Sequence, residues 1–155
     1  MQLIWPLPPS ANAMWRNIVI GGRPRTLLSK SAREYHSRVE EIMQMNPETS
    51  QNRQGEDFIF KKGVCLGVTI QIQPRGKRRC DLDNYCKGIL DTLQRVNVME
   101  DDKDVHALRL FLQPMPENPT FPEGQAVITL EEWYYLQFRE YPEPLTVSDH
   151  AKETN

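Results

Sequence analysis

The sequence predicts a single α+β domain, in which a small mixed β-sheet carries two helices packed on one face, in the order β-α-β-α-β-β. Two periodicities support this prediction. Apolar and polar residues alternate over residues 64–73 and 125–131, as in strands whose two faces differ. Apolar residues recur every three or four positions over residues 31–45 and 82–96, as on the buried side of a helix. A chain of 155 residues is long enough to bury one core.

The first part of the chain is expected to hold one strand, one helix and two loops. Residues 2–5 form an apolar strand that the prolines of PLPPS end. Residues 6–29 are rich in Pro, Gly, Asn and Arg and are expected to form a long loop, which in a compact domain is often functional. A helix over residues 31–45 follows, capped by Ser29 or Ser31, and then a polar loop over residues 46–63.

The second part begins with the strand over residues 64–73 and continues through a basic loop into the helix over residues 82–96. Asp81 stands in the N-cap position of that helix. After a turn, residues 105–112 and 125–131 are expected to form the last two strands. The chain beyond is aromatic and then rich in proline, so residues 1–132 are expected to be the folded domain and residues 133–155 a partly disordered C-terminal extension.

Composition argues against a membrane protein, a secreted protein and a protein built on disulfides or a cysteine zinc site. No apolar run approaches the ~18 residues of a membrane span, and the N-terminus has no basic segment of a signal peptide, so a cytoplasmic protein without a membrane partner is expected. Three cysteines without a CxxC pair argue against a disulfide framework and a cysteine zinc site. The net charge of −2 conceals +6 on residues 1–95 and −8 on residues 96–155. This distribution indicates either a basic face or a chance imbalance beside an acidic tail.

The segment RGKRRCDLDNYCKGILDTLQ, residues 75–94, joins a basic run to an acidic helix. Asp81 and Asp83 form a DxD pair where the loop becomes helix, and a second acidic group, EDDKD at 100–104, follows the helix. If the next strand runs back along the helix, the second group approaches the first. Grouped carboxylates suit a hard cation such as Mg²⁺, which prefers oxygen ligands and keeps several waters.

Cations beside such a metal suit phosphodiester chemistry. Arg and Lys side chains hold the nucleic-acid backbone, and a lysine such as Lys87 can stabilise the charge that develops on the phosphate. The residues alone leave other interpretations open. Asp81 can be just a helix cap, Asp83, Lys87 and Asp91 can be an exposed ladder of ion pairs, and EDDKD can be just a turn.

RRCDLDNYCKGILDTL followed by VMEDDKDV resembles the RusA family of Holliday junction resolvases, and PPSANAMWR is similar to that family's Pro-Ser-x-Asn segment. The resemblance spans roughly residues 2–132. It implies a RusA-like fold and a homodimeric crossover junction endodeoxyribonuclease that depends on Mg²⁺, with Mn²⁺ as the alternative. Such an enzyme binds four-way DNA junctions, nicks two opposing strands symmetrically and serves DNA recombination and repair, often in a phage or prophage.

The resemblance also implies a role for each matching residue. The metal-binding acids fall on Asp81, Asp83 and Asp102, with Asp101 as the alternative to Asp102, and the functional lysine falls on Lys87. Asp91 matches a helix acid whose part in catalysis is less clear. The residues assigned to DNA contact are Arg75, Lys77, Arg78, Arg79, Asn12 and Arg16.

Two other functions fit the same residues. The chain can be a non-catalytic DNA-binding module, or a metal-dependent nuclease that acts more broadly on branched DNA such as flaps and forks. For the expected dimer, the aromatic segment WYYLQF at 133–138 is one candidate for the interface.

Overall fold

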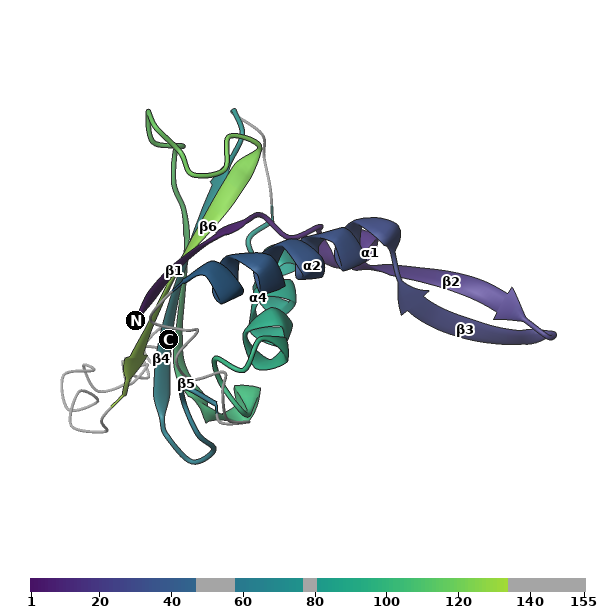
Figure 1. Cartoon of the computed structure of the whole chain (residues 1–155), viewed down its shortest axis with the longest axis horizontal. Coiled ribbons are helices and arrows are strands. Elements are labelled where there is room, and N and C mark those ends of the chain that lie inside the picture. Colours follow the sequence, from purple (N-terminus) through teal and green to yellow (C-terminus); the bar gives the residue numbers. More distant parts are fainter. Residues whose placement is uncertain (47–57, 77–80, 134–155) are drawn as a thin grey trace, which may run out of the picture.

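A computed structural model describes residues 1–46, 58–76 and 81–133. Figure 1 shows its elements along the chain. They are β1 (Gln2–Pro6), α1 (Ala11–Met14), β2 (Trp15–Ile20), β3 (Arg23–Leu28), α2 (Lys30–Met45), β4 (Leu66–Pro74), α4 (Asp83–Arg95), the 3₁₀ helix η2 (Asp102–Asp104), β5 (Val105–Leu112) and β6 (Gly124–Glu132).

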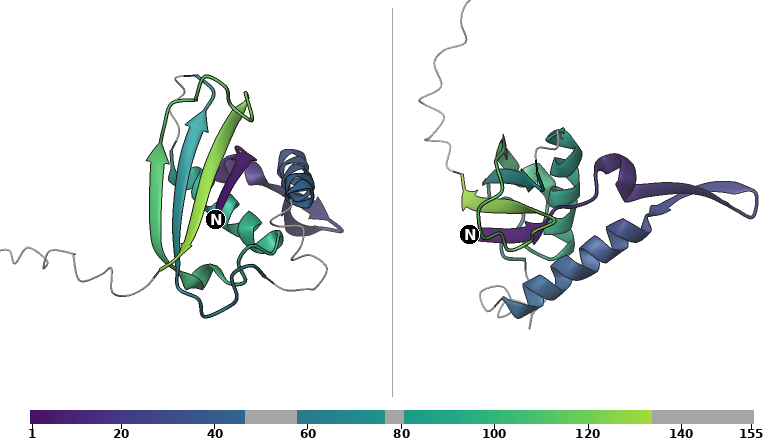
Figure 2. Two further views of the ribbon diagram at one scale, coloured as in Figure 1. Left: turned by 60° about the vertical axis from the view of Figure 1, so that its left-hand side comes forward. Right: turned by 90° about the horizontal axis from the view of Figure 1, so that it is seen from above.

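The main sheet has four strands in the order β1-β6-β4-β5. β6 is antiparallel to both of its neighbours, β1 and β4, whereas β5 is parallel to β4. The predicted mixed sheet is therefore confirmed. Helices α2 and α4 lie on the same face of the sheet, as Figure 2 shows, so the predicted α+β arrangement is also confirmed.

The core lies between this face and the two helices. Alternate residues of the strands point into it, among them Trp5, Ile70 and Ile128, and none of these three is exposed to solvent. The helices contribute residues at helical spacing, such as Val39 from α2 and Leu93 from α4, both fully buried. The apolar periodicity in the sequence thus identifies the side of each helix and strand that packs against the core.

The expected long loop over residues 6–29 is wrong. The structure shows a short helix, α1, and then a two-stranded antiparallel hairpin, β2–β3, that pairs Trp15 with Leu28 and Ile20 with Arg23. The two residues between the strands are Gly21 and Gly22, with φ of 57° and 75°. Two such residues form the tight turn that matches the twist of a hairpin, and glycine adopts them without steric cost. The prolines and arginines of this segment are typical of a loop, whereas the Gly-Gly dipeptide between two extended runs is typical of a hairpin.

Two smaller expectations also need correction. Within the described ranges, α1 is present in addition to the two expected helices, as is the 3₁₀ helix η2. Asp81 does not cap α4 with its side chain. Leu82 occupies the N-cap position without a side-chain hydrogen bond, and the Asp81 carboxylate instead accepts a hydrogen bond from Asn84 Nδ2 at 3.2 Å. By contrast, Ser29 caps α2 as expected, accepting a hydrogen bond from the backbone N–H of Ala32.

Several expectations fall on residues outside the described ranges. These are most of the loop over 46–63, the cations Lys77, Arg78 and Arg79, and the C-terminal extension after Trp133. Trp133 itself is buried, and its backbone N–H donates to the carbonyl of Cys65. Among the described helices, none is long and apolar enough to cross a membrane.

Candidate active site

The DxD pair lies at the start of α4. Asp81 precedes the helix, Asp83 is its first residue, and both side chains are exposed. Asp83 forms no hydrogen bond or ion pair with another residue in the described part of the chain. The helix N-terminus favours negative charge there, so Asp83 is stabilised without a cationic partner.

The predicted lysine lies one turn further along the same helix. Lys87 Nζ is 3.2 Å from Asp91 Oδ1, and the Lys87 side chain is 72% exposed. An exposed pair of this kind contributes little to stability, so little free energy would be lost if the ammonium group left Asp91. Asp91 therefore holds Lys87 on the surface of α4 that Asp83 shares.

The second acidic group uses three of its four carboxylates to hold neighbouring backbone. Glu100 accepts from the N–H of Lys62 at 2.8 Å and Asp104 from the N–H of Gly63 at 2.9 Å. Asp101 accepts from the N–H of Lys103. That backbone hydrogen bond is the main reason why the pKa of Asp101 lies below its ordinary value, and the charges of Lys103 and Lys62 add to it.

Asp102 differs from these three. Its side chain is exposed, and it accepts no hydrogen bond from backbone in the described residues, although it lies in side-chain contact with Asp101. Of the two acids that the sequence left as alternatives, Asp102 is therefore the one whose carboxylate holds no described backbone N–H.

The structure does not bring Asp102 to the DxD pair within one chain. Asp83 begins α4, whereas Asp102 follows its C-terminal end, and a helix of 13 residues is about 20 Å long. β5 does run back along the helix (Figure 1), but Asp102 precedes this strand and follows the C-terminal end of α4. No group of three or more acids, histidines or cysteines within the described ranges could hold a metal. The expected approach is therefore wrong for a single copy.

The remaining predicted residues lie on three elements. Arg75 is exposed directly after β4, Asn12 is exposed on α1, and Arg16 is exposed on β2. Helix α1 packs against α4, where Met14 lies close to Gly88. Asn12 is thus carried beside the helix that holds Asp83.

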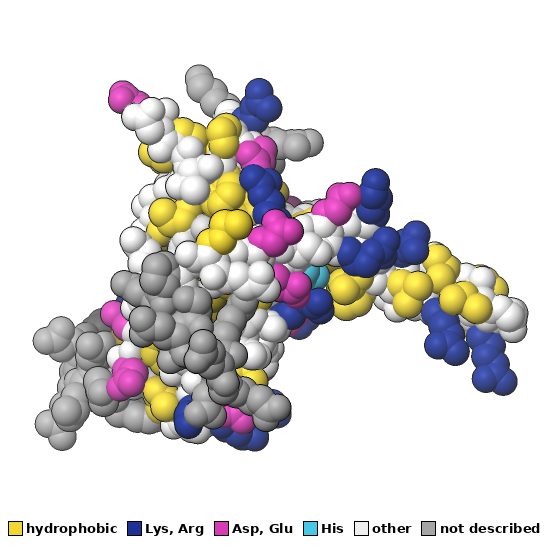
Figure 3. All heavy atoms as spheres, in the orientation of Figure 1, with side chains coloured by type: hydrophobic (Ala, Val, Ile, Leu, Met, Phe, Trp, Pro, Cys, Tyr) yellow, Lys and Arg dark blue, Asp and Glu magenta, His cyan; other side chains and the backbone are white. Residues whose placement is uncertain are grey.

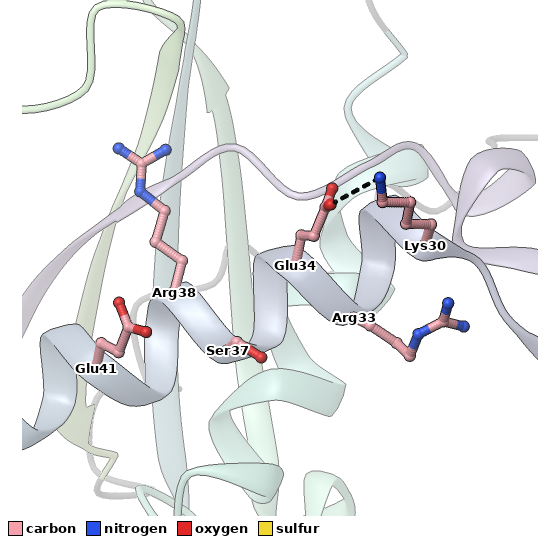
Figure 4. A pocket seen from close by; sticks show the side chains of 6 residues that line it. All are labelled: Lys30, Arg33, Glu34, Ser37, Arg38 and Glu41. Carbon is pink, nitrogen blue, oxygen red and sulfur yellow. Dashed lines mark ion pairs between the residues drawn. The ribbon is translucent and has the colours of Figure 1, made fainter.

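A surface hollow of about 590 Å³ lies elsewhere, along α2 (Figure 4). All of its lining residues come from that one helix, and they are Lys30, Arg33, Glu34, Ser37, Arg38 and Glu41. Lys30 and Glu34 form an ion pair of 3.6 Å within the hollow. It contains none of the predicted site residues, and its mixed charge is that of an ordinary solvated helix face.

The acid pair fits a hard divalent cation. Mg²⁺ is commonly held by one or two carboxylates together with water and substrate phosphates. Asp81 and Asp83 supply two exposed carboxylates, two positions apart. Neither forms an ion pair with a described cation that would have to be displaced.

The sequence also matches known proteins. It matches the family described as Endodeoxyribonuclease RusA over residues 6–119. It is 31% identical over 110 residues to the crossover junction endodeoxyribonuclease rusA of Enterobacteria phage HK97, an alignment that covers 71% of this chain and 80% of the relative. These matches identify a nuclease, a hydrolase that cuts DNA internally. The chain belongs to the RusA family of junction-resolving endonucleases.

Arg23 and Arg25 are further cations of this segment that the sequence did not assign to DNA contact, although the expected loop over residues 6–29 is of a kind that is often functional. The signal that identifies their setting is the Gly-Gly dipeptide between two extended runs.

Proposed function

We propose that this protein resolves four-way DNA junctions by paired symmetric nicks, acting as a homodimer that depends on Mg²⁺ or Mn²⁺. The observation that supports this most directly is the exposed DxD pair at the start of α4, in a chain of the RusA family. DNA recombination and repair are the processes that such an activity serves, and the phage relative agrees with a phage or prophage setting.

Each residue has a distinct part in this proposal. Asp81, Asp83 and Asp102 would hold the divalent cation, which would supply an activated water and stabilise charge on the phosphate oxygens. Lys87 leaves Asp91 and places its ammonium group on the phosphate as negative charge develops. Arg75 and the neighbouring basic run hold the DNA backbone. The products carry a 5′-phosphate and a 3′-hydroxyl.

Two copies of the chain offer a way to gather the three acids. Since Asp83 begins α4, which is about 20 Å long, and Asp102 follows its other end, a complete set requires Asp102 from a partner. A junction has approximate two-fold symmetry, and a C₂ dimer provides two equivalent sites for two opposed cuts.

The edge strand β5 is the surface that we assign to this dimer. β5 has a neighbour on one side only among the described strands, and it exposes Leu108, Phe111 and Leu112 by 43–49%. A long apolar edge strand is a template for pairing with another chain. Antiparallel pairing of two such strands places the start of β5 beside the end of the partner's β5.

This pairing has a direct consequence for the acids. Leu112, at the end of β5, pairs with Ile72 near the end of β4, and the chain after β4 leads to Asp81. Asp102, at the start of β5, would therefore lie at the same end of the joined sheet as the partner's DxD pair. The aromatic segment 133–138 remains the other candidate for the interface, and all but Trp133 lies outside the described ranges.

The first test is cleavage of a labelled four-way junction with Mg²⁺ and with EDTA. The wild-type protein is expected to make paired symmetric nicks that require the metal, and to leave linear duplex uncut. Asp83→Asn is expected to abolish cleavage while binding stays equal or tightens, because one repulsive charge is lost. Junction binding without any cut would favour a non-catalytic module, and equal cutting of flaps and forks would favour a broader nuclease.

A further inference from the structure

The β2–β3 hairpin is an arm that adds nothing to the core. It extends away from the sheet and the two long helices (Figure 1), and Figure 2 shows the same projection from above. Ten of its twelve strand residues are exposed, including Trp15 at 50% and Val19 at 72%. A two-stranded hairpin is marginally stable by itself in water, so an arm of this kind calls for a function beyond folding.

The register of the hairpin separates its side chains into two faces. Residues paired across the strands share a face, and faces alternate along each strand. On one face every pair combines an arginine with an aliphatic residue, namely Arg16↔Leu27, Ile18↔Arg25 and Ile20↔Arg23. The other face is uncharged and consists of Trp15↔Leu28, Asn17↔Thr26 and Val19↔Pro24.

No residue in the described part of the chain neutralises the arginine face. Residues 15–28 contain no acid. Arg16, Arg23 and Arg25 form no ion pair with a residue in the described part of the chain. Figure 3 shows cationic side chains projecting from one side of the arm, with apolar side chains along it. Three unpaired guanidinium groups on a narrow ribbon suit phosphates, which they can contact by paired hydrogen bonds.

The arm is fixed at its base and braced along its length. The backbone N–H of Ser29 donates to the carbonyl of Met14 at 2.9 Å, and Arg33 Nη1 donates to the carbonyl of Leu28 at 2.7 Å. Thr26 Oγ1 donates to Asn17 Oδ1 across the uncharged face. Pro24 removes one backbone donor from β3, as edges that avoid a third strand do.

We propose that this arm is a second DNA-binding site, in which the arginine face of the β2–β3 hairpin binds the phosphate backbone beside a groove of the DNA. A two-stranded ribbon fits the major groove, and the aliphatic partner of each arginine can contact the sugars and base edges there. Because α1 joins the arm to α4, DNA held by the arm lies on the helix that carries Asp83 and Lys87. The inference rests on the proposed function for the identity of the polyanion.

The test measures DNA binding against salt concentration for two matched double variants. R23Q with R25Q removes two charges from the arm, whereas K30Q with R38Q removes two charges from α2, where both residues have acidic partners. The arm variant is expected to lower the slope of log K against log salt by about 2, because each lost phosphate contact removes about 0.9. The control is expected to keep the wild-type slope.

Two further results separate failure of this inference from failure of the proposed function. Arg23→Lys with Arg25→Lys keeps both charges and is expected to retain the wild-type slope. If R23Q with R25Q keeps the wild-type DNA affinity and salt slope while the protein still cuts junctions, the arm is not a DNA-binding site. The proposed function is then unaffected. If the wild-type protein neither binds nor cuts junctions, the proposed function fails first and the arm has no DNA to bind.

Discussion

At the scale of single residues, the structure separates acids that a sequence cannot tell apart. The side chains of Glu100, Asp101 and Asp104 each accept a hydrogen bond from a backbone N–H, whereas the side chain of Asp102 is exposed and accepts none from the described backbone. The sequence could predict an acidic group here, because EDDKD is visible in it. It could not predict which side chain lacks such a bond, since two of the three bonds come from the N–H groups of Lys62 and Gly63, about forty positions earlier.

This difference predicts opposite results for two neighbouring substitutions. Asp102→Asn is expected to reduce junction cleavage by about 100-fold or more, the usual loss when one charge-stabilising group leaves an active site. Asp101→Asn is expected to retain most of the cleavage and to lower the melting temperature instead. Rates under single-turnover conditions, with melting curves for both variants, check this. Equal losses of rate would contradict the assignment.

The free energy of unfolding is expected to depend on pH through His36. It is buried between α2 and α4, with Nδ1 3.4 Å from Thr92 Oγ1. Burial lowers the pKa of His36 below its ordinary value of 6.5, and the charge of Arg95 acts in the same direction against Glu40 and Asp91. The unfolded chain therefore takes up the proton first as pH falls below about 6.5, and the free energy of unfolding decreases.

The measurement is a series of melting temperatures between pH 8 and pH 5. His36→Gln is expected to flatten the loss below pH 6.5, whereas His106→Gln is expected to preserve it because that ring is exposed on β5. A wild-type melting temperature that rises on acidification would contradict the sign.

At the scale of elements, helices and strands that pack on the core were predictable and the arm was not. α4 and β4 carry a periodic apolar pattern because one side of each is buried. The hairpin has no buried side, so its residues carry no such pattern, and its tight turn is recorded by Gly21 and Gly22 alone.

Replacing Gly67 or Gly88 by alanine is expected to have different effects on stability. A Cβ on Gly67 of β4 would lie 2.7 Å from Trp133 Cε3, so Gly67→Ala is expected to destabilise the fold by about 1–3 kcal/mol. A Cβ on Gly88 of α4 would lie 3.5 Å from Pro8 Cβ, an ordinary contact. Gly88→Ala is therefore expected to be neutral or to stabilise by up to about 1 kcal/mol, because alanine favours a helix. Urea unfolding midpoints of both variants test this pair.

At the scale of the whole molecule, the sequence predicts the DxD pair and the later acid as components of one site, but it does not predict their separation within one copy. That separation follows from α4 lying between them and from β5 running parallel to β4. A sequence records neither the strand order nor a partner. Sequence similarity identifies the family without stating which copy supplies each acid.

A shared site predicts a crossed result in mixed dimers. A dimer of one Asp83→Asn copy and one Asp102→Asn copy is expected to retain one intact site, built from the two unchanged residues, and to nick one strand. A dimer of wild type with a copy carrying both substitutions is expected to be inactive, because each site then contains one changed residue. A site built within one copy would give the reverse of both results, and nicking of labelled strands distinguishes the two arrangements.

The length of α4 has a consequence for when cutting can begin. If the acids at its two ends belong to different sites, a solitary copy can occupy DNA and still be harmless. At protein concentrations below the dissociation constant of the dimer, the rate of nicking would then rise with the square of the protein concentration. The occupancy of DNA by single copies would rise in direct proportion to that concentration. The length of α4 would thus make cleavage depend on dimer formation, so that DNA is cut little when the protein concentration is low.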